Sequence, residues 1–111
     1  MNVLRPQGMV QLTQEENDLR EGLRIGSTVD QSRAYLKSRG IDFYEYKSNV
    51  RQEITRRDAT IVALLGDGVI SARVATKAWE FPCGYVIDVV LVIDVHDVVK
   101  QSSISQVLMC P

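Results

Sequence analysis

The chain has 111 residues, of which 45% are hydrophobic and 24% are charged, and its formal net charge is −1. This length and composition predict one globular domain, residues 1–111, that can bury a core without disulfide staples. Nucleic-acid-binding domains usually carry a basic excess, so the charge argues against a nucleic acid as partner. The basic clusters at Arg51 and Arg56-Arg57 are interleaved with acidic residues, which indicates a solvated loop and not a phosphate-binding patch.

No segment predicts a membrane span. The longest apolar run, residues 86–93, is interrupted by Asp88 and is far shorter than the roughly 20 residues that a spanning helix needs. Residues 1–11 lack the charged and apolar regions of a signal peptide. We therefore expect a cytoplasmic chain, or a periplasmic one if a leader has been removed. We also expect residues 1–11 to be a frayed lead-in or to pair at a sheet edge.

A first helix is predicted over residues 12–26. Thr13 and Glu16 have the spacing of a capping box, which would start the helix there. Leucines recur at helical spacing along one stripe, namely Leu12, Leu19 and Leu23. Gly22 weakens the last turn, and Gly26 is expected to end the helix.

The second helix, residues 27–40, has the clearest signals. Ser27 or Thr28 can cap it, and Thr28 with Gln31 has capping-box spacing. Gly40 stands where a left-handed residue ends many helices. The inward stripe is narrow and consists of Val29, Ser32 and Leu36.

The pattern changes to strands after residue 40. Residues 41–47 are aromatic and β-branched, and residues 59–65 form a second strand. The polar stretch between them is predicted as a loop, with a short strand around Ile54 as an alternative. Gly-Asp-Gly at 66–68 is interpreted as a hairpin turn whose return strand is 69–79. A helix over 69–78 is the competing prediction, because alanine, arginine and lysine favour helices.

The C-terminal third predicts a second hairpin. Pro82 and Gly84 break the chain, strand 85–93 follows, and 98–108 is the return strand. The predicted fold is therefore α+β, with two N-terminal helices packed on a four- or five-stranded, mostly antiparallel meander sheet.

The four residues Asp94-Val95-His96-Asp97 join the last two strands and include the only histidine. Carboxylate and imidazole groups bind metals, so a metal site or a catalytic base is an alternative to a turn. Aspartate at the start of a turn is explained by bonds from its side chain to the backbone two residues on. We interpret the segment as a turn, and we predict no catalytic, cofactor-binding or metal-binding residues.

Four side chains could surround a ligand cleft, namely Tyr44, Tyr46, Trp79 and His96. Aromatic residues in such positions are more often half-buried in a sheet with a polar tip in water. Any Ser-His-Asp triad would need His96, and nothing in the sequence brings a serine to it.

The two cysteines, Cys83 and Cys110, can be placed by strand register. If Asp94 faces Asp97, then Cys83 faces Leu108, two residues from Cys110. A disulfide is then possible if the strand ends bend, and the alternative is a pair of free thiols.

Strand 85–93 is apolar on both faces. An antiparallel sheet that is covered on one side should alternate apolar and polar residues, yet the second face is also apolar. It consists of Val86, Asp88, Val90 and Val92. Two short helices cannot cover both faces, so this face predicts a homo-oligomer, a dimer or tetramer, or a docked protein partner. The alternative is that the helices straddle both faces.

Three stretches together resemble a known family. They are the helix end "GLRIGST", the amphipathic helix "VDQSRAYLKSRG" and the closing hairpin "VVLVIDVHDVVKQSSIS". The pattern resembles the β-lactamase-inhibitor-like fold, shared with a small lipoprotein of bacterial outer-membrane assembly, over residues 19–108. The resemblance implies a bacterial, non-enzymatic module that acts through its sheet surface. Asp97 stands where glycine or asparagine is commoner.

The sequence therefore favours a non-catalytic interaction module that self-associates through a sheet face. The alternative is a small-molecule-binding protein or enzyme with a pocket between sheet and helices.

Overall fold

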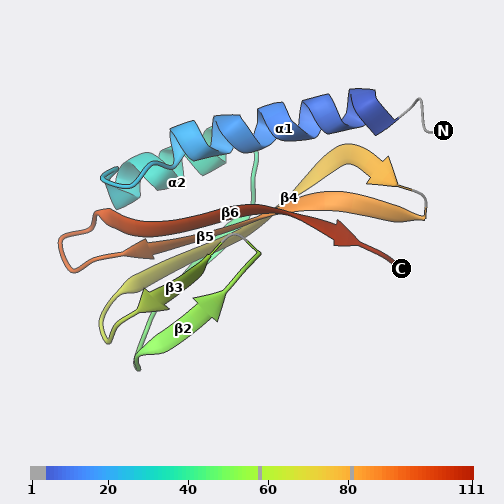
Figure 1. The fold of residues 1–111 in the computed structure, drawn as a ribbon. Helices are drawn as coiled ribbons and strands as arrows, with labels where there is room; N and C mark the ends of the chain where they lie inside the picture. The colour runs from blue at the N-terminus through green and yellow to red at the C-terminus, as the bar shows by residue number, and fades with distance from the viewer. Residues whose placement is uncertain (1–4, 58, 81) are drawn as a thin grey trace.

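The computed structural model describes residues 5–57, 59–80 and 82–111, with side chains other than those of 5–10 and 80. Two helices, α1 (Arg5–Gly22) and α2 (Val29–Ser38), precede six strands. The strands are β1 (Phe43–Lys47), β2 (Gln52–Thr55), β3 (Thr60–Ala63), β4 (Gly68–Glu80), β5 (Cys83–Ile93) and β6 (Val99–Met109). Both helices lie on one face of a four-stranded antiparallel sheet, and a two-stranded sheet lies on the other (Figure 1). The predicted α+β class is confirmed.

Helix α1 begins earlier than the sequence predicts. It starts at Arg5, so Thr13 lies inside the helix and does not cap it, and the expected lead-in is helical from residue 5. Residues 1–4 lie outside the described residues. Pro6 at the start of a helix is tolerated, because the first turn has no hydrogen-bond partner for a backbone N–H. The helix ends at Gly22 and not at the predicted Gly26, and the Tyr35 ring lies so close to Gly22 that an added Cβ would overlap its Cε1 atom.

Helix α2 agrees with its predicted signals. The Thr28 hydroxyl accepts from the Gln31 backbone N–H, and the Gln31 side chain accepts from the Thr28 N–H. Gly40 has φ +69°, the left-handed conformation expected at the helix end. The predicted stripe is buried, and it consists of Val29, Ser32 and Leu36.

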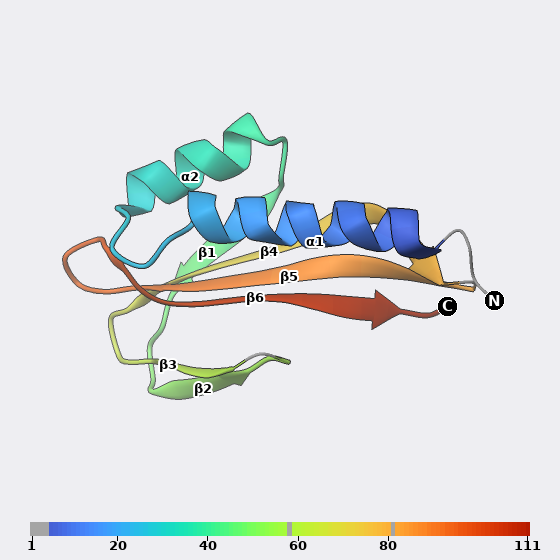
Figure 2. The same ribbon diagram turned by 45° about the horizontal axis from the view of Figure 1, so that its top comes forward.

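The main core lies between the helices and the sheet. Alternate residues of β5 face the helices, and four of them, Ile87, Val89, Leu91 and Ile93, are buried in the core. Leucines of α1 pack against them from above, namely Leu12, Leu19 and Leu23. Arg33 of α2 also binds both carboxylate oxygens of Glu45 on β1, at 2.8 and 2.9 Å. Figure 2 shows both helices on this side of the sheet. We call it the helix face.

Strand β3 does not pair with β4, so the hairpin predicted between residues 59–65 and 69–79 is wrong. Strand β4 pairs with β1 and β5, while β3 pairs with β2. The segment 69–78 is strand and not helix. The short strand predicted as an alternative around Ile54 is β2.

The first four strands form one long hairpin that is folded over. In β1–β4 Phe43 pairs with Ala72, and in β2–β3 Thr55 pairs with Thr60, so the residue numbers of every pair add to 115 in both. The register thus continues through a corner made by residues 48–51 on one arm and 64–67 on the other. Beyond that corner, β2 and β3 fold back under the sheet (Figure 1).

Candidate functional site

The face of the sheet opposite the helices, which we call the back face, has two different halves. The folded-over hairpin covers one half, and there Val90 and Val92 pack against Ile61 and Ala63 and are 2% and 0% exposed. The proposed oligomer face of Val86, Asp88, Val90 and Val92 is therefore corrected. The expectation that a second subunit, a docked protein partner or straddling helices would cover this face overlooked the chain's own β2–β3 hairpin.

Asp88 lies at the boundary between the two halves. Its carboxylate accepts from Arg73 Nε at 2.8 Å and from Arg73 Nη2 at 3.4 Å across the β4–β5 pair. The side chain of Asp88 is 14% exposed, and the Arg73 guanidinium compensates its charge within the chain. The hydrogen bond and the charge of Asp88 raise the pKa of Arg73.

The other half of the back face is bare in the described structure. Strand pairing places Trp79 opposite Gly84, and Gly84 opposite Met109. Trp79 is 51% and Met109 41% exposed, although both are large apolar side chains. The next row consists of Ala75, Val86 and Val107, of which Ala75 is exposed and the two valines are half-buried. We call these five residues, Ala75, Trp79, Val86, Val107 and Met109, the bare patch.

Tyr44 and Tyr46 lie together, but not with the other predicted cleft residues. Both are exposed on the outermost strand β1, on the back face, where Tyr44 pairs with Ser71. They line a hollow of about 300 Å³ beside β2, and the Tyr46 hydroxyl accepts from Gln52 Nε2 at 3.1 Å. The expected pocket was one between the sheet and the helices. This hollow lies on the opposite side of the sheet.

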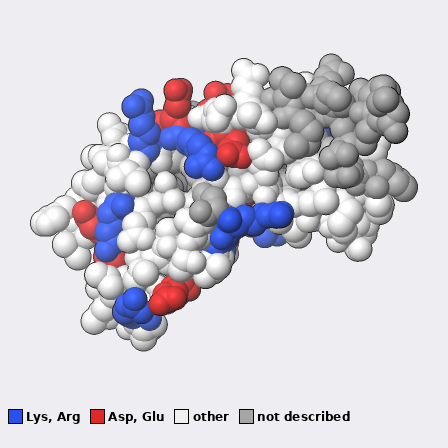
Figure 3. Space-filling model, viewed as in Figure 1, with Lys and Arg blue, Asp and Glu red and all other residues white. Residues whose placement is uncertain are grey.

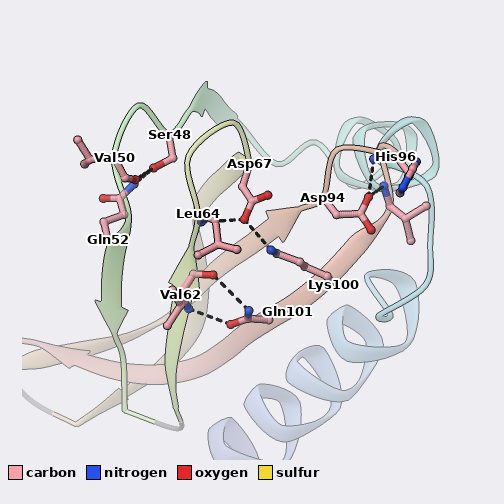
Figure 4. A network of polar contacts seen from close by, with 11 residues as sticks. Ser48, Val50, Gln52, Val62, Leu64, Asp67, Asp94, His96, Lys100 and Gln101 are labelled. Carbon is pink, nitrogen blue, oxygen red and sulfur yellow. Dashed lines mark hydrogen bonds and ion pairs between the residues drawn. The ribbon is translucent and has the colours of Figure 1, made fainter.

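His96 does not line this hollow and lies on the loop between β5 and β6. The Asp94 carboxylate accepts from the backbone N–H of His96 at 2.8 Å and of Val98 at 3.1 Å (Figure 4). These bonds confirm the predicted aspartate-led turn. Asp97 has φ +62°, the left-handed conformation for which glycine or asparagine is commoner. Within the described residues, no three histidine, cysteine, aspartate or glutamate side chains gather as a metal site.

A buried ion pair holds the corner of the folded hairpin. The Asp67 carboxylate, only 4% exposed, accepts from Lys100 Nζ at 2.7 Å and from the Leu64 backbone N–H at 2.8 Å (Figure 4). Burial pushes the pKa of Asp67 upward, but the hydrogen bonds from Lys100 and Leu64 outweigh it, so the pKa is lowered. Sequence reasoning missed this pair, because Asp67 was interpreted as an ordinary turn residue between two glycines.

Lys100 reaches Asp67 because it is the extra residue of a β-bulge. Val92 pairs with Gln101 and Ile93 with Val99, so Lys100 has no partner in the ladder. A bulge redirects side chains locally, and here Lys100 points toward the corner. The neighbouring Gln101 also bonds the hairpin, donating to the Val62 carbonyl and accepting from the Val62 N–H (Figure 4).

Cys83 and Cys110 form a disulfide, with their Cα atoms 4.2 Å apart. Gly84 pairs with Met109, so the register carried one step further sets the two cysteines opposite each other. The predicted register placed Cys83 against Leu108. The difference of two residues arises because the turn extends to Val98 and Lys100 bulges.

Comparisons with protein-family models, with curated proteins and with solved structures find no match to this chain. The resemblance to the β-lactamase-inhibitor-like fold therefore stays a prediction. Among the helices in the described part of the chain, none combines the length and the apolar character needed to cross a membrane.

Proposed function

We propose that the protein is a non-catalytic interaction module that self-associates by packing the bare patch of one copy against that of another. The observation that carries the proposal is the contrast between the two halves of one sheet face. Val92 is fully buried under the hairpin, whereas Trp79 and Met109 expose half or nearly half of their surfaces. Large exposed apolar side chains gathered on one surface typically mark an interaction site.

The shape of the molecule supports the same proposal. Its radius of gyration is 14.8 Å and its extents are 49 × 26 × 19 Å. A compact chain of this length has a radius of gyration of about 13 Å. The elongation arises because β4, β5 and β6 extend beyond the folded hairpin, with α1 on one side only (Figure 1). A second copy would supply the missing third layer there.

A two-fold interface brings the same surface of each copy together, so the bare patch of one copy can pack against that of the other. Stable interfaces bury on the order of 800 Å² per partner. The Arg73–Asp88 pair at the edge of the patch fits a polar rim, because its charges are already compensated within each copy. Asp88 therefore does not oppose association in the way that an unpaired carboxylate would.

The single tryptophan makes the proposal testable, because Trp79 lies in the bare patch. We expect light scattering to give twice the 12.5 kDa chain mass, and dilution to shift Trp79 emission to longer wavelength as the dimer dissociates. Val86→Glu should yield a monomer. Val95→Glu is the matched control, because Val95 is 70% exposed on the β5–β6 loop, outside the patch.

A monomeric wild-type chain at about 100 μM, with emission independent of concentration, would exclude this proposal. Val90→Glu is unsuitable as a test, because Val90 is buried under the hairpin and a charge there would displace β2–β3.

We also propose, from the Cys83–Cys110 bond, that the protein works in an oxidising compartment. Disulfides persist in such compartments and are rare in the cytosol. The test is alkylation of free thiols at the moment of cell lysis. Protection of both cysteines would support an oxidising compartment, and full labelling would support the cytoplasm.

A further inference from the structure

A cleft on the back face lies between the tip of the β2–β3 hairpin and the outer strands of the sheet. It is made of two hollows, of about 530 and 300 Å³, that share four lining residues. These shared residues are Tyr44, Arg56, Ser71 and Val90. The combined volume is in the range of small-molecule sites, which span roughly 300–1,000 Å³. The cleft is distinct from the bare patch, which lies farther along β4, β5 and β6.

Arg56 supplies the uncompensated positive charge of this cleft. Its Nη1 donates to the neighbouring Thr55 carbonyl at 3.0 Å, and no carboxylate among the described residues pairs with it. Two lining carboxylates are already paired, Asp88 with Arg73 and Glu53 with Arg51. The third acid among the described lining residues is Asp42, which is exposed. Figure 3 shows Lys and Arg side chains in several separate groups on this side of the molecule, one of them near its middle.

Further hydrogen-bond donors line the same cleft. Arg73 uses Nε and Nη2 on Asp88, which leaves its Nη1 group available, and its side chain is 55% exposed. The hydroxyls of Ser71 and Tyr44 have no hydrogen-bond partner among the described residues, and both residues line the larger hollow. An arginine fork with nearby hydroxyls is suited to a planar carboxylate, which accepts two parallel N–H bonds.

The other walls are apolar or aromatic. Val69, Val90 and Ile54 line the inner part of the smaller hollow, and the exposed rings of Tyr44 and Tyr46 form one side. A ligand in this cleft therefore needs an anionic end for the arginines and an apolar or aromatic body for the tyrosines.

We propose that this cleft binds a carboxylate attached to an apolar body, with Arg56 as the principal charge partner. One uncompensated arginine matches one negative charge, which favours a carboxylate over a phosphate dianion. The carboxylate can come from a small organic acid or from an acidic side chain of an extended peptide.

The test uses two probes on the intact ¹⁵N-labelled chain at low salt. One is 3-phenylpropionate, with neutral 3-phenylpropanamide as its control. The other is the end-blocked peptide Val-Thr-Glu-Thr-Val, with its glutamine counterpart as control. We expect saturable shifts of the Tyr44, Arg56 and Ser71 amide signals with a carboxylate probe and none with its neutral control. The probe that saturates binding at the lower concentration shows whether the bound carboxylate belongs to a small organic acid or to a peptide.

Variants decide whether the arginine is responsible. Arg56→Gln should weaken binding about tenfold, the effect of losing one charge-assisted hydrogen bond. Arg57→Gln should change it less than about twofold, because the adjacent Arg57 does not line the cleft. Lack of saturation by both carboxylates at about 10 mM would overturn the proposal. Equal loss in both variants, or equally strong binding of inorganic phosphate, would also overturn it.

Discussion

The side-chain amide of Gln101 on β6 bonds both backbone groups of Val62 on β3. Its oxygen accepts from the Val62 N–H at 2.9 Å, and its nitrogen donates to the Val62 carbonyl at 3.2 Å. The Gln101 amide thus makes the two backbone hydrogen bonds that a neighbouring strand would make with Val62, and it attaches the folded hairpin to the sheet. Together with the Asp67–Lys100 ion pair, it explains why the hairpin covers Val90 and Val92 and does not extend into solvent.

Gln101→Ala should therefore loosen the hairpin. Two hydrogen bonds are lost and the Val62 backbone groups lose their partner, so we expect the free energy of unfolding to fall by about 2 kcal/mol. Amide exchange at Val62 should accelerate more than exchange in β5. Gln106→Ala is the matched control, because Gln106 lies on the same strand but bonds Glu16 on the helix face. Unchanged exchange at Val62 would show that packing and the Asp67–Lys100 pair hold the hairpin without Gln101.

Two features fixed by local chemistry could be predicted from the sequence, although the capping box predicted at Thr13 and Glu16 is wrong. The capping box of Thr28 and Gln31 and the aspartate-led turn at Asp94 need only neighbouring residues, and both were predicted correctly. The two-residue period of a strand also groups Ile87, Val89, Leu91 and Ile93 on one face of β5, which is the helix face.

Features that depend on distant residues could not be predicted in the same way. Gly-Asp-Gly at 66–68 has the pattern of an ordinary hairpin turn. It forms a corner in the structure, where Asp67 pairs with Lys100, a residue distant in the sequence. The bulge at Lys100 likewise shifts the register on which the disulfide depends. The sequence indicated that the second face of β5 must be covered, and this is confirmed for Val90 and Val92. It could not indicate that 52–63 covers half of it, because this stretch is short and largely polar.

The Asp67–Lys100 pair predicts a specific acid sensitivity. The pKa of Asp67 is lowered in the folded state, so its contribution to stability is fully present above the unfolded pKa of about 4. That contribution is lost as the pH falls through the lower folded pKa. Asp67→Asn should reduce the free energy of unfolding at pH 7 by about 2–3 kcal/mol, and reduce the further loss below pH 4.

Urea unfolding between pH 7 and pH 2.5 measures both effects of Asp67→Asn. Asp42→Asn is the control, because Asp42 is an exposed carboxylate with no ion pair among the described residues. If the free energy of unfolding changed with pH in the same way for wild type and Asp67→Asn, Asp67 would not be the source of this acid sensitivity. Some acid dependence should remain in the variant, because the Arg33 hydrogen bonds also lower the pKa of Glu45.

Gly22→Ala should destabilise this protein, although replacing glycine with alanine usually stabilises a helix. Glycine to alanine in a helix commonly gains up to about 1 kcal/mol. Here the new Cβ would overlap Cε1 of Tyr35, whose hydroxyl donates to the Asp18 carbonyl at 2.9 Å. We expect Gly22→Ala to destabilise the protein by about 1–3 kcal/mol in thermal or urea unfolding.

A double-mutant cycle isolates the Gly22 contact. In a Tyr35→Ala background the ring is absent, so the same Gly22→Ala change should be neutral or stabilising. A loss of equal size in both backgrounds would place the cause in the helix backbone and not in the Tyr35 ring.

The Cys83–Cys110 disulfide should stabilise the end of the sheet that carries the bare patch. The cysteines are 27 residues apart in sequence, and closing a loop of that length contributes about 3–4 kcal/mol. Trp79 pairs with Gly84, next to Cys83, and Met109 precedes Cys110, so reduction should loosen the patch before the hairpin-covered half. Urea unfolding with and without dithiothreitol measures the stability, and amide exchange locates the loosening. The Cys83→Ser/Cys110→Ser double variant should have the same free energy of unfolding as the reduced wild type. Dithiothreitol should not change its stability. Identical unfolding of the oxidised and reduced wild type would show that strand pairing alone holds this end, and the disulfide would then have no role in ordering the patch.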